Sequence, residues 1–170
     1  MKRLLLLRHA KAVPATEPLV DITRPLAERG ERDARRIAER LHEQQLRPAL
    51  ILTSPAARAL RTAQIVASVT GYAPERIALE RRLYLAEPTA IVEIIAAQDA
   101  AVETLLVVGH NPGLTDLVHR LLPEFDVDDM PTGAVVGIDY AVAWSSVDDA
   151  TAALAYYDFP KNSRAPVTAR

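Results

Sequence analysis

The sequence predicts an α/β fold, a three-layer α/β/α sandwich around a mostly parallel central sheet. Three short apolar runs, at residues 4–7, 50–53 and 105–108, have the length and hydrophobicity of strands buried on both faces. A helical pattern follows each run, and this alternation is typical of a parallel sheet covered by helices. The 170 residues fit one domain, which we expect to span residues 1–160.

The composition excludes several classes of protein. Hydrophobic residues make up 49% of the chain, charged residues 25%, and the formal net charge is -2, which disfavours both disorder and non-specific binding to nucleic acid. The sequence has no cysteine, which excludes disulfides and thiolate catalysis and is compatible with the cytoplasm, the location we expect. The four leucines near the start are too few for a secretory signal, and we expect no membrane association.

The first half of the chain alternates strands with helices. Residues 25–45 place apolar side chains on one face and charges elsewhere, as in an amphipathic helix. The strand at 50–53 leads into a second helix, in which Ser54 is a good N-cap and Pro55 a good first residue, and which ends near Gly71. Residues 76–84 indicate a weaker, more exposed strand and a turn.

The second half continues this pattern and then changes to strands. A third helix is expected to open at Pro88, and the strand at 105–108 precedes a fourth helix that Asn111 can cap and Pro112 begins. The last third of the sequence indicates two strands, at residues 133–144 and 151–159, with a polar turn between them at residues 148–149. Residues 161–170 are expected to form a loose tail.

Four chemically active side chains lie at the junctions between strands and helices. Arg8 and His9 follow the first strand, Arg58 lies in the first turn of the second helix, and His110 follows the strand at 105–108. Ligands of open α/β sheets bind beyond the carboxyl ends of the strands, so these side chains should share one edge. Guanidinium groups suit the oxygens of a phosphoryl group, which predicts a phosphate site.

A histidine in that setting can attack phosphorus and form a covalent phosphohistidine that water then hydrolyses. His9 is the better placed nucleophile, while His110 would donate to the developing charge and the arginines would stabilise the transition state. Each residue also has an ordinary structural explanation, as a surface cation, a polar group at a strand end or turn, or an ion-pair partner on a helix. Their occurrence together favours the functional interpretation.

Three segments of the sequence resemble signatures of the histidine phosphatase (phosphoglycerate mutase-like) superfamily. "LLLLRHAKA" is similar to its Arg-His-Gly signature, with Ala10 where glycine is commonest. "TSPAARALRTAQIV" resembles its Ser-Pro-x-x-Arg-Ala-x-x-Thr segment, and "VVGHNPGL" its second-histidine segment. "DITRPLAERG" and the closing "DFPK" are similar to the SixA-type phosphohistidine phosphatases within that superfamily.

The resemblance implies a phosphoglycerate mutase-like fold and a phosphate pocket made of Arg8, Arg58 and the two histidines, with His9 as the residue phosphorylated. It implies no metal or other cofactor, and as partner a protein carrying phosphohistidine, such as a phosphotransfer domain. No spacing of histidines typical of a metal site is present, and a metal site remains a weak alternative. His42 and His119 are expected at the surface.

Further residues are candidates for substrate binding at the mouth of the pocket. Lys11, Asp21 and Arg24 belong here, although a turn bond to its own backbone explains Asp21 equally well. Asn111 could touch phosphate but is already explained as a helix cap.

One acid of the superfamily has no clear counterpart in this sequence. Many members have a glutamate after the third strand that protonates the leaving group, whereas "RRLYLAEP" has Tyr84 and Leu85 near that place and no acid before Glu87. Glu87 precedes Pro88, so its simplest role is to cap a helix, where the dipole keeps it ionised and a poor acid. Glu87 is therefore a possible acid only. Phosphohistidine is the favoured substrate, because the imidazole that it expels is easily protonated and leaves readily.

Three functions follow from these observations. The first is a metal-independent phosphatase acting on protein phosphohistidine. The second is a phosphatase acting on a small phosphomonoester, or a mutase. The absence of long insertions counts against the mutase. The third is a module that binds phosphate without turnover, against which the presence of both histidines counts.

Overall fold

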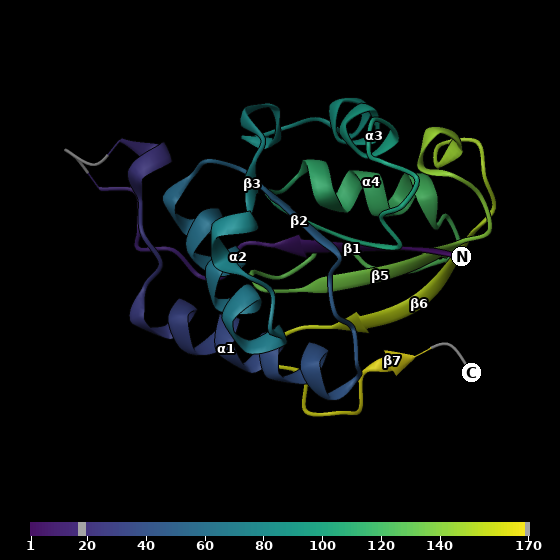
Figure 1. Cartoon of the computed structure of the whole chain (residues 1–170). Coiled ribbons are helices and arrows are strands. Elements are labelled where there is room, and N and C mark those ends of the chain that lie inside the picture. The colour runs from purple at the N-terminus through teal and green to yellow at the C-terminus, as the bar shows by residue number, and fades with distance from the viewer. Residues whose placement is uncertain (17–19, 169–170) are drawn as a thin grey trace.

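The computed structural model describes residues 1–16 and 20–168 and confirms the predicted α/β sandwich (Figure 1). The described strands are β1 (Lys2–Arg8), β2 (Leu50–Thr53), β3 (Ala78–Leu79), β4 (Thr104–Gly109), β5 (Val135–Tyr140), β6 (Ala152–Asp158) and β7 (Val167–Thr168). The described helices are α1 (Glu28–Glu43), α2 (Ala57–Thr70), α3 (Pro88–Ala96) and α4 (Gly113–Leu121).

The described strands form a single sheet in the order β3-β2-β4-β1-β5-β6-β7. The strands β3, β2, β4 and β1 pair in parallel, whereas β5, β6 and β7 extend the sheet by antiparallel pairing. Because β6 reverses the direction of β5, it runs the same way as β1. The sheet is therefore mostly parallel, as predicted, with a mixed edge on the side of β5.

The four leucines of β1 divide between the two faces of the sheet. Leu4 and Leu6 pack with α3 and α4, and Leu5 and Leu7 pack with α1 and α2. Successive side chains of a strand point to opposite faces, so a strand covered on both faces needs an unbroken apolar run. Figure 1 shows the two pairs of helices on opposite sides of the sheet.

Helices α1 and α2 both begin later than the sequence predicts. The residues just before α1 pair with the chain after β1 instead. The carbonyl oxygen of Pro25 accepts a hydrogen bond from the N–H of Val13, and Leu26 forms a β-bridge with Ala12. Before α2, the Ser54 hydroxyl accepts from the backbone N–H of Ala56 at 3.2 Å, which forms a turn rather than a helix cap.

The other helix ends agree more closely with the sequence. Gly71 ends α2 in the left-handed conformation, with φ of 78°, and α3 begins at Pro88. Glu87 has the backbone of an N-cap, but its side chain makes no capping hydrogen bond. α4 begins at Gly113, one residue later than predicted, with Pro112 rather than Asn111 at the N-cap position. The Asn111 side chain still accepts from the N–H of Thr115, in the first turn of α4, at 3.3 Å.

The C-terminal part of the chain differs from the sequence prediction at two places. The strand expected to reach residue 144 ends at Tyr140, because Trp144 begins a short 3-10 turn and its indole N–H donates to the carbonyl oxygen of Val102 at 2.8 Å. The segment expected as a loose tail includes β7, which pairs with β6 through Tyr156 and Thr168. Residues 169–170 of that tail lie outside the described residues.

Candidate active site

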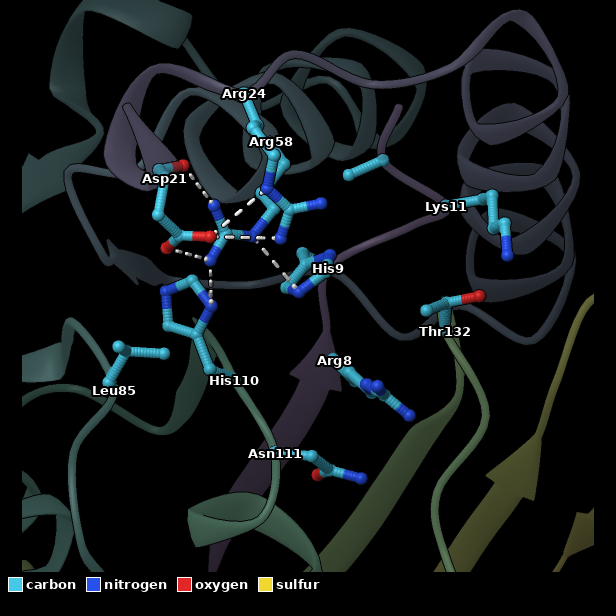
Figure 2. A pocket seen from close by; sticks show the side chains of 11 residues that line it. Arg8, His9, Lys11, Asp21, Arg24, Arg58, Leu85, His110, Asn111 and Thr132 are labelled. Atoms are coloured by element: carbon cyan, nitrogen blue, oxygen red, sulfur yellow. Dashed lines mark hydrogen bonds and ion pairs between the residues drawn. The ribbon is translucent and has the colours of Figure 1, made fainter. Parts of the chain in front are cut away.

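The predicted site forms at the carboxyl ends of β1 and β4, which are neighbours in the sheet. The chain leaves β1 toward α1 on one face and leaves β4 toward α4 on the other, and such a reversal opens a crevice between two strands. The crevice has a volume of about 360 Å³. Its lining consists of Arg8, His9, Lys11, Ala12, Asp21, Arg24, Arg58, Leu85, His110, Asn111 and Thr132 (Figure 2).

His9 is buried and held in one tautomer by the backbone. Its Nδ1 lies 2.8 Å from the carbonyl oxygen of Ala10, which only accepts hydrogen bonds, so Nδ1 carries the hydrogen. The lone pair therefore belongs to Nε2, which receives a hydrogen bond from Arg58 Nε at 3.3 Å. Burial, opposed by the bond to Ala10 and reinforced by Arg58, lowers the pKa of His9 to about 4. The imidazole is neutral and nucleophilic at neutral pH.

Arg58 lies between the two histidines and is itself buried. Its Nη1 donates to the carbonyl oxygen of Asp21 at 2.8 Å, and its Nη2 donates to the Asp21 carboxylate at 3.0 Å. The same Nη2 faces Nδ1 of His110 at 3.4 Å. Hydrogen bonds from Nε and from both Nη atoms thus fix the orientation of the guanidinium group, as Figure 2 shows.

His110 has the opposite tautomer to His9. Arginine only donates, so Nδ1 of His110 accepts from Arg58, and Nε2 donates to the Ser54 hydroxyl at 2.7 Å. Burial above all, then the charges of His9 and Arg58, lowers the pKa of His110 to about 3. The centroids of the two imidazole rings are 5.1 Å apart. Sequence analysis missed this role of Ser54 because the residue also fits the pattern of a helix cap.

Asp21 lies at the mouth of the crevice, as predicted, and connects three other side chains. Its carboxylate accepts from Arg58, from the Tyr84 hydroxyl and from Arg24 Nε at 3.0 Å. The bond from Tyr84, followed by those from Arg58 and Arg24, lowers the pKa of Asp21 to about 2. The carboxylate is ionised at neutral pH and orients Arg58 from outside. Tyr84 is a second residue of the site whose role the sequence did not reveal.

Arg8 and Asn111 line the opposite wall of the crevice (Figure 2). Arg8 Nη1 donates to the carbonyl oxygen of Met130 at 2.6 Å and lies 3.6 Å from the Asp129 carboxylate. Asn111 Nδ2 donates to the same carboxylate at 2.6 Å. The segment after α4 therefore positions both side chains. Lys11 also lines the crevice, near Thr132.

The structure places Glu87, the possible acid, outside the lining of the crevice. Its side chain is exposed and does not line the crevice, because the preceding backbone turns at Leu85, with φ of 50°, and brings Leu85 to the crevice in its place. His42 and His119 are exposed, as expected. Within residues 1–16 and 20–168 no cluster of three histidine or carboxylate side chains could hold a metal ion. Nor does any helix there combine the length and apolarity needed to cross a bilayer.

Comparisons with known proteins show the family to which the chain belongs. The sequence profile of the histidine phosphatase superfamily, branch 1, matches residues 4–84. The crystal structure of a protein assigned as the phosphohistidine phosphatase SixA from Agrobacterium tumefaciens is 31% identical, with a TM-score of 0.73, and the match covers 92% of this chain and 96% of that one. The chain belongs to the histidine phosphatase superfamily.

Other members of the histidine phosphatase superfamily and their relatives match over a similar extent. A structure assigned as SixA from Nakamurella multipartita is 26% identical, with a TM-score of 0.76, and the match covers 95% of this chain and 97% of that one. An uncharacterized protein of Mycobacterium tuberculosis is 32% identical over 164 residues, which cover 91% of this chain and 100% of the relative. The similarity therefore includes the antiparallel edge of the sheet as well as the segment that the profile matches.

Proposed function

We propose that the protein is a cytoplasmic, metal-independent phosphatase that hydrolyses phosphohistidine on another protein, such as a phosphotransfer domain. Three observations support the proposal. The lone pair of His9 Nε2 lies in the crevice beside Arg58, the crevice carboxylate Asp21 is ionised, and the chain is similar in structure to proteins assigned as SixA.

The first step transfers the phosphoryl group to the enzyme. The lone pair of His9 Nε2 attacks phosphorus, the P–N bond of the substrate breaks, and its electron pair returns to the substrate ring. A substrate ring protonated on its other nitrogen leaves as neutral imidazole. His9 keeps its Nδ1 hydrogen on the carbonyl of Ala10, so the phosphorylated ring is an imidazolium.

The second step releases phosphate. A water molecule attacks phosphorus, the P–N bond to His9 breaks, and the electron pair returns to Nε2. Both hydrogens of the water leave with the phosphoryl group as dihydrogen phosphate, and His9 is again the neutral imidazole. The Nδ1 hydrogen helps this step, since the ring departs without a negative charge.

The remaining residues of the crevice stabilise the transferring phosphoryl group. Arg8 and Arg58 provide guanidinium donors from opposite walls, which suits a group with three equatorial oxygens. Burial, and after it the nearby positive charges, lower the pKa of His110. A phosphoryl dianion in the crevice opposes the effect of these charges and favours the imidazolium. His110 then donates to the developing negative charge.

The state of Asp21 is the observation that carries the choice of substrate. With a pKa of about 2, this carboxylate holds no proton to donate at neutral pH, and Glu87 lies outside the crevice. An alkyl phosphate expels a strongly basic alkoxide and needs such a donor, whereas a protonated phosphohistidine does not. Neither carboxylate can therefore protonate a departing alkoxide, and this supports P–N over alkyl P–O bonds as the substrate.

A direct comparison of substrates tests the proposal. Phosphate release is measured from a histidine-phosphorylated phosphotransfer domain, from phosphoserine and from a sugar phosphate. We expect rapid release of phosphate from the phosphotransfer domain only. During turnover the enzyme should carry a covalent phosphoryl label that is labile to acid and stable to base. Efficient release from the two esters alone would make the protein a small-molecule phosphatase. Binding of phosphate without release from any substrate would make it a binding module.

A further inference from the structure

A second cavity adjoins the active site on the side of Lys11 and Thr132. It has a volume of about 340 Å³, and both of these residues line the two cavities. Figure 2 shows Lys11 and Thr132 on the side of His9 that faces away from Asp21 and Leu85. The other residues that line it are Arg29, Asp33, Pro131, Phe159, Pro160 and Lys161.

The segment that carries Lys161 is held in place by α1. Arg36 donates to the carbonyl oxygen of Pro160 at 3.1 Å, and Arg40 donates to that of Phe159 at 3.1 Å. The Arg40 guanidinium group also pairs with the Asp158 carboxylate at 3.0 Å, and Asp158 is fully buried. These bonds fix the start of the chain after β6, so Lys161 begins from a defined position beside the cavity.

The opposite wall of the second cavity is attached to the catalytic strand. The N–H of Gly133 donates to the carbonyl oxygens of Arg8 and His9, both at 3.1 Å. A Cβ atom on Gly133 would lie 2.8 Å from Pro160, so the two walls approach closely at this point. The second cavity is therefore fixed relative to His9 and is part of the same rigid frame.

The charge of this cavity is positive. Arg29 pairs with Asp33 at 3.5 Å, which compensates one of its three cations. Lys11 and Lys161 are both exposed, and neither ammonium group forms an ion pair in the described part of the chain. Phe159 and two prolines provide an apolar floor beside these charges. Two uncompensated ammonium groups above an apolar floor suit a carboxylate on a short aliphatic stem.

We propose that the second cavity is a subsite for an aspartate or glutamate side chain that lies near the phosphohistidine on the partner protein. Lys11 and Lys161 bind the carboxylate while the phosphoryl group occupies the crevice at His9. This inference rests on the proposed function and deepens it, because it adds a determinant of partner choice. It also gives the closing "DFPK" segment a functional role, since Asp158 anchors the segment and Lys161 contacts the substrate.

Two phosphohistidine peptides test the subsite. One has glutamates beside the phosphohistidine and the other has glutamines, and the quantity measured is the ratio of their kcat/KM values. An exposed ion pair contributes up to about 1 kcal/mol, which corresponds to about fivefold. We expect the wild type to prefer the acidic peptide about fivefold and Lys161→Gln to reduce this preference to about twofold or less. The Lys161→Glu variant should instead prefer a third peptide, with lysines at these positions.

A matched control separates local from overall charge. The Arg32→Gln variant also removes one positive charge from the protein, but Arg32 pairs with Glu28 on the exposed face of α1. It should leave the ratio unchanged. Equal kcat/KM values for both peptides with wild-type protein, or an equal effect of Arg32→Gln and Lys161→Gln, overturn the subsite and leave the proposed phosphatase standing. Failure to hydrolyse any phosphohistidine peptide overturns both.

Discussion

Arg58 determines the geometry of the active site because its three nitrogens face both histidines and Asp21. We expect Arg58→Lys to lower kcat/KM by roughly 100- to 1,000-fold, since lysine is a point charge and cannot reproduce the planar set of donors. Vanadate inhibition should weaken in parallel. Arg61→Lys is the control, because Arg61 lies on the same helix and pairs with Glu31 at the surface. Vanadate inhibition as strong as in the wild type would place the phosphate site elsewhere.

His9 is the side chain on which the covalent step depends. We expect His9→Ala to abolish turnover, because the variant lacks the Nε2 lone pair that the bond to Ala10 fixes and that lies beside Arg58. During turnover the wild type should carry the acid-labile label and the variant should carry none, while both give the same far-ultraviolet circular dichroism. His119→Ala, at an exposed position, should retain activity. A label on serine in either protein would contradict the mechanism.

Ser54 acts through His110 rather than on the substrate. Its hydroxyl accepts the Nε2 hydrogen of His110 and thereby fixes which nitrogen faces Arg58 and the crevice. Loss of one buried hydrogen bond costs about 1–2 kcal/mol, so we expect Ser54→Ala to lower kcat about 10-fold with little change in KM. Ser54→Thr keeps the hydroxyl and should restore most of the activity. An unchanged kcat in Ser54→Ala would show that the backbone alone orients His110.

The sequence predicted the charged residues of the site better than the residues that orient them. Arg8 is the last residue of β1, and His9 and His110 directly follow β1 and β4, so the position of each strand end located them. Ser54 fitted a helix cap, and Tyr84 fitted an exposed turn, because a local pattern does not show that a side chain contacts a residue distant in the sequence. Ser54 contacts His110 because β2 and β4 pair side by side, and Tyr84 contacts Asp21, which is distant from it in the sequence.

At the scale of elements, the attachment of the chain after β6 to α1 depends on the ion pair of Arg40 and Asp158. Arg40→Ala leaves a fully buried carboxylate without its charge partner, and we expect the free energy of unfolding to fall by about 3–5 kcal/mol. Urea unfolding measures this change. Arg36→Ala removes only a hydrogen bond to the Pro160 carbonyl and should cost about 1 kcal/mol. An equal decrease in the free energy of unfolding in the two variants would show that the buried Asp158 carboxylate does not need Arg40 as its charge partner.

Helix boundaries show where local rules end and tertiary contacts begin. Capping preferences predicted the start of α3 at Pro88 and the end of α2 at Gly71, where nothing else competes for the backbone. At the start of α2, however, the Ser54 hydroxyl is used by His110 and by a turn. The predicted start fails at a site residue because function and helix capping require the same hydroxyl group.

At the scale of the whole molecule, the sequence predicted the three layers but not the order of the strands. Apolar runs without alternation indicate burial on both faces, and this was enough to predict the sandwich. The pairing of β1 with β4 joins segments about a hundred residues apart, and no local pattern specifies it. That pairing brings His9 and His110 together, so the sequence alone supported a shared edge but not the distance between the two rings.

The same burial that prepares the histidines for catalysis makes the whole fold sensitive to acid. Burial lowers the pKa of His9 to about 4 and that of His110 to about 3, from 6.5 in an unstructured chain. Below pH 6.5 the unfolded chain therefore binds protons that the folded protein excludes, and the free energy of unfolding falls as the pH decreases toward these lowered values. Above pH 6.5 the two histidines contribute no pH dependence.

We expect the free energy of unfolding, measured with urea, to decrease from pH 6.5 to pH 4, with a slope of up to about 1.4 kcal/mol per pH unit for each excluded proton. The double variant His9→Gln/His110→Gln should have a flatter profile over this range, because glutamine does not titrate. His42→Gln should keep the wild-type slope, because His42 is exposed on α1. Inorganic phosphate should stabilise the wild type, and by more than it stabilises the double variant, because the bound dianion favours the protonated histidines. An identical slope in the wild type and the double variant would show that both rings reach solvent in the folded state, and would remove the basis for a neutral nucleophile at His9.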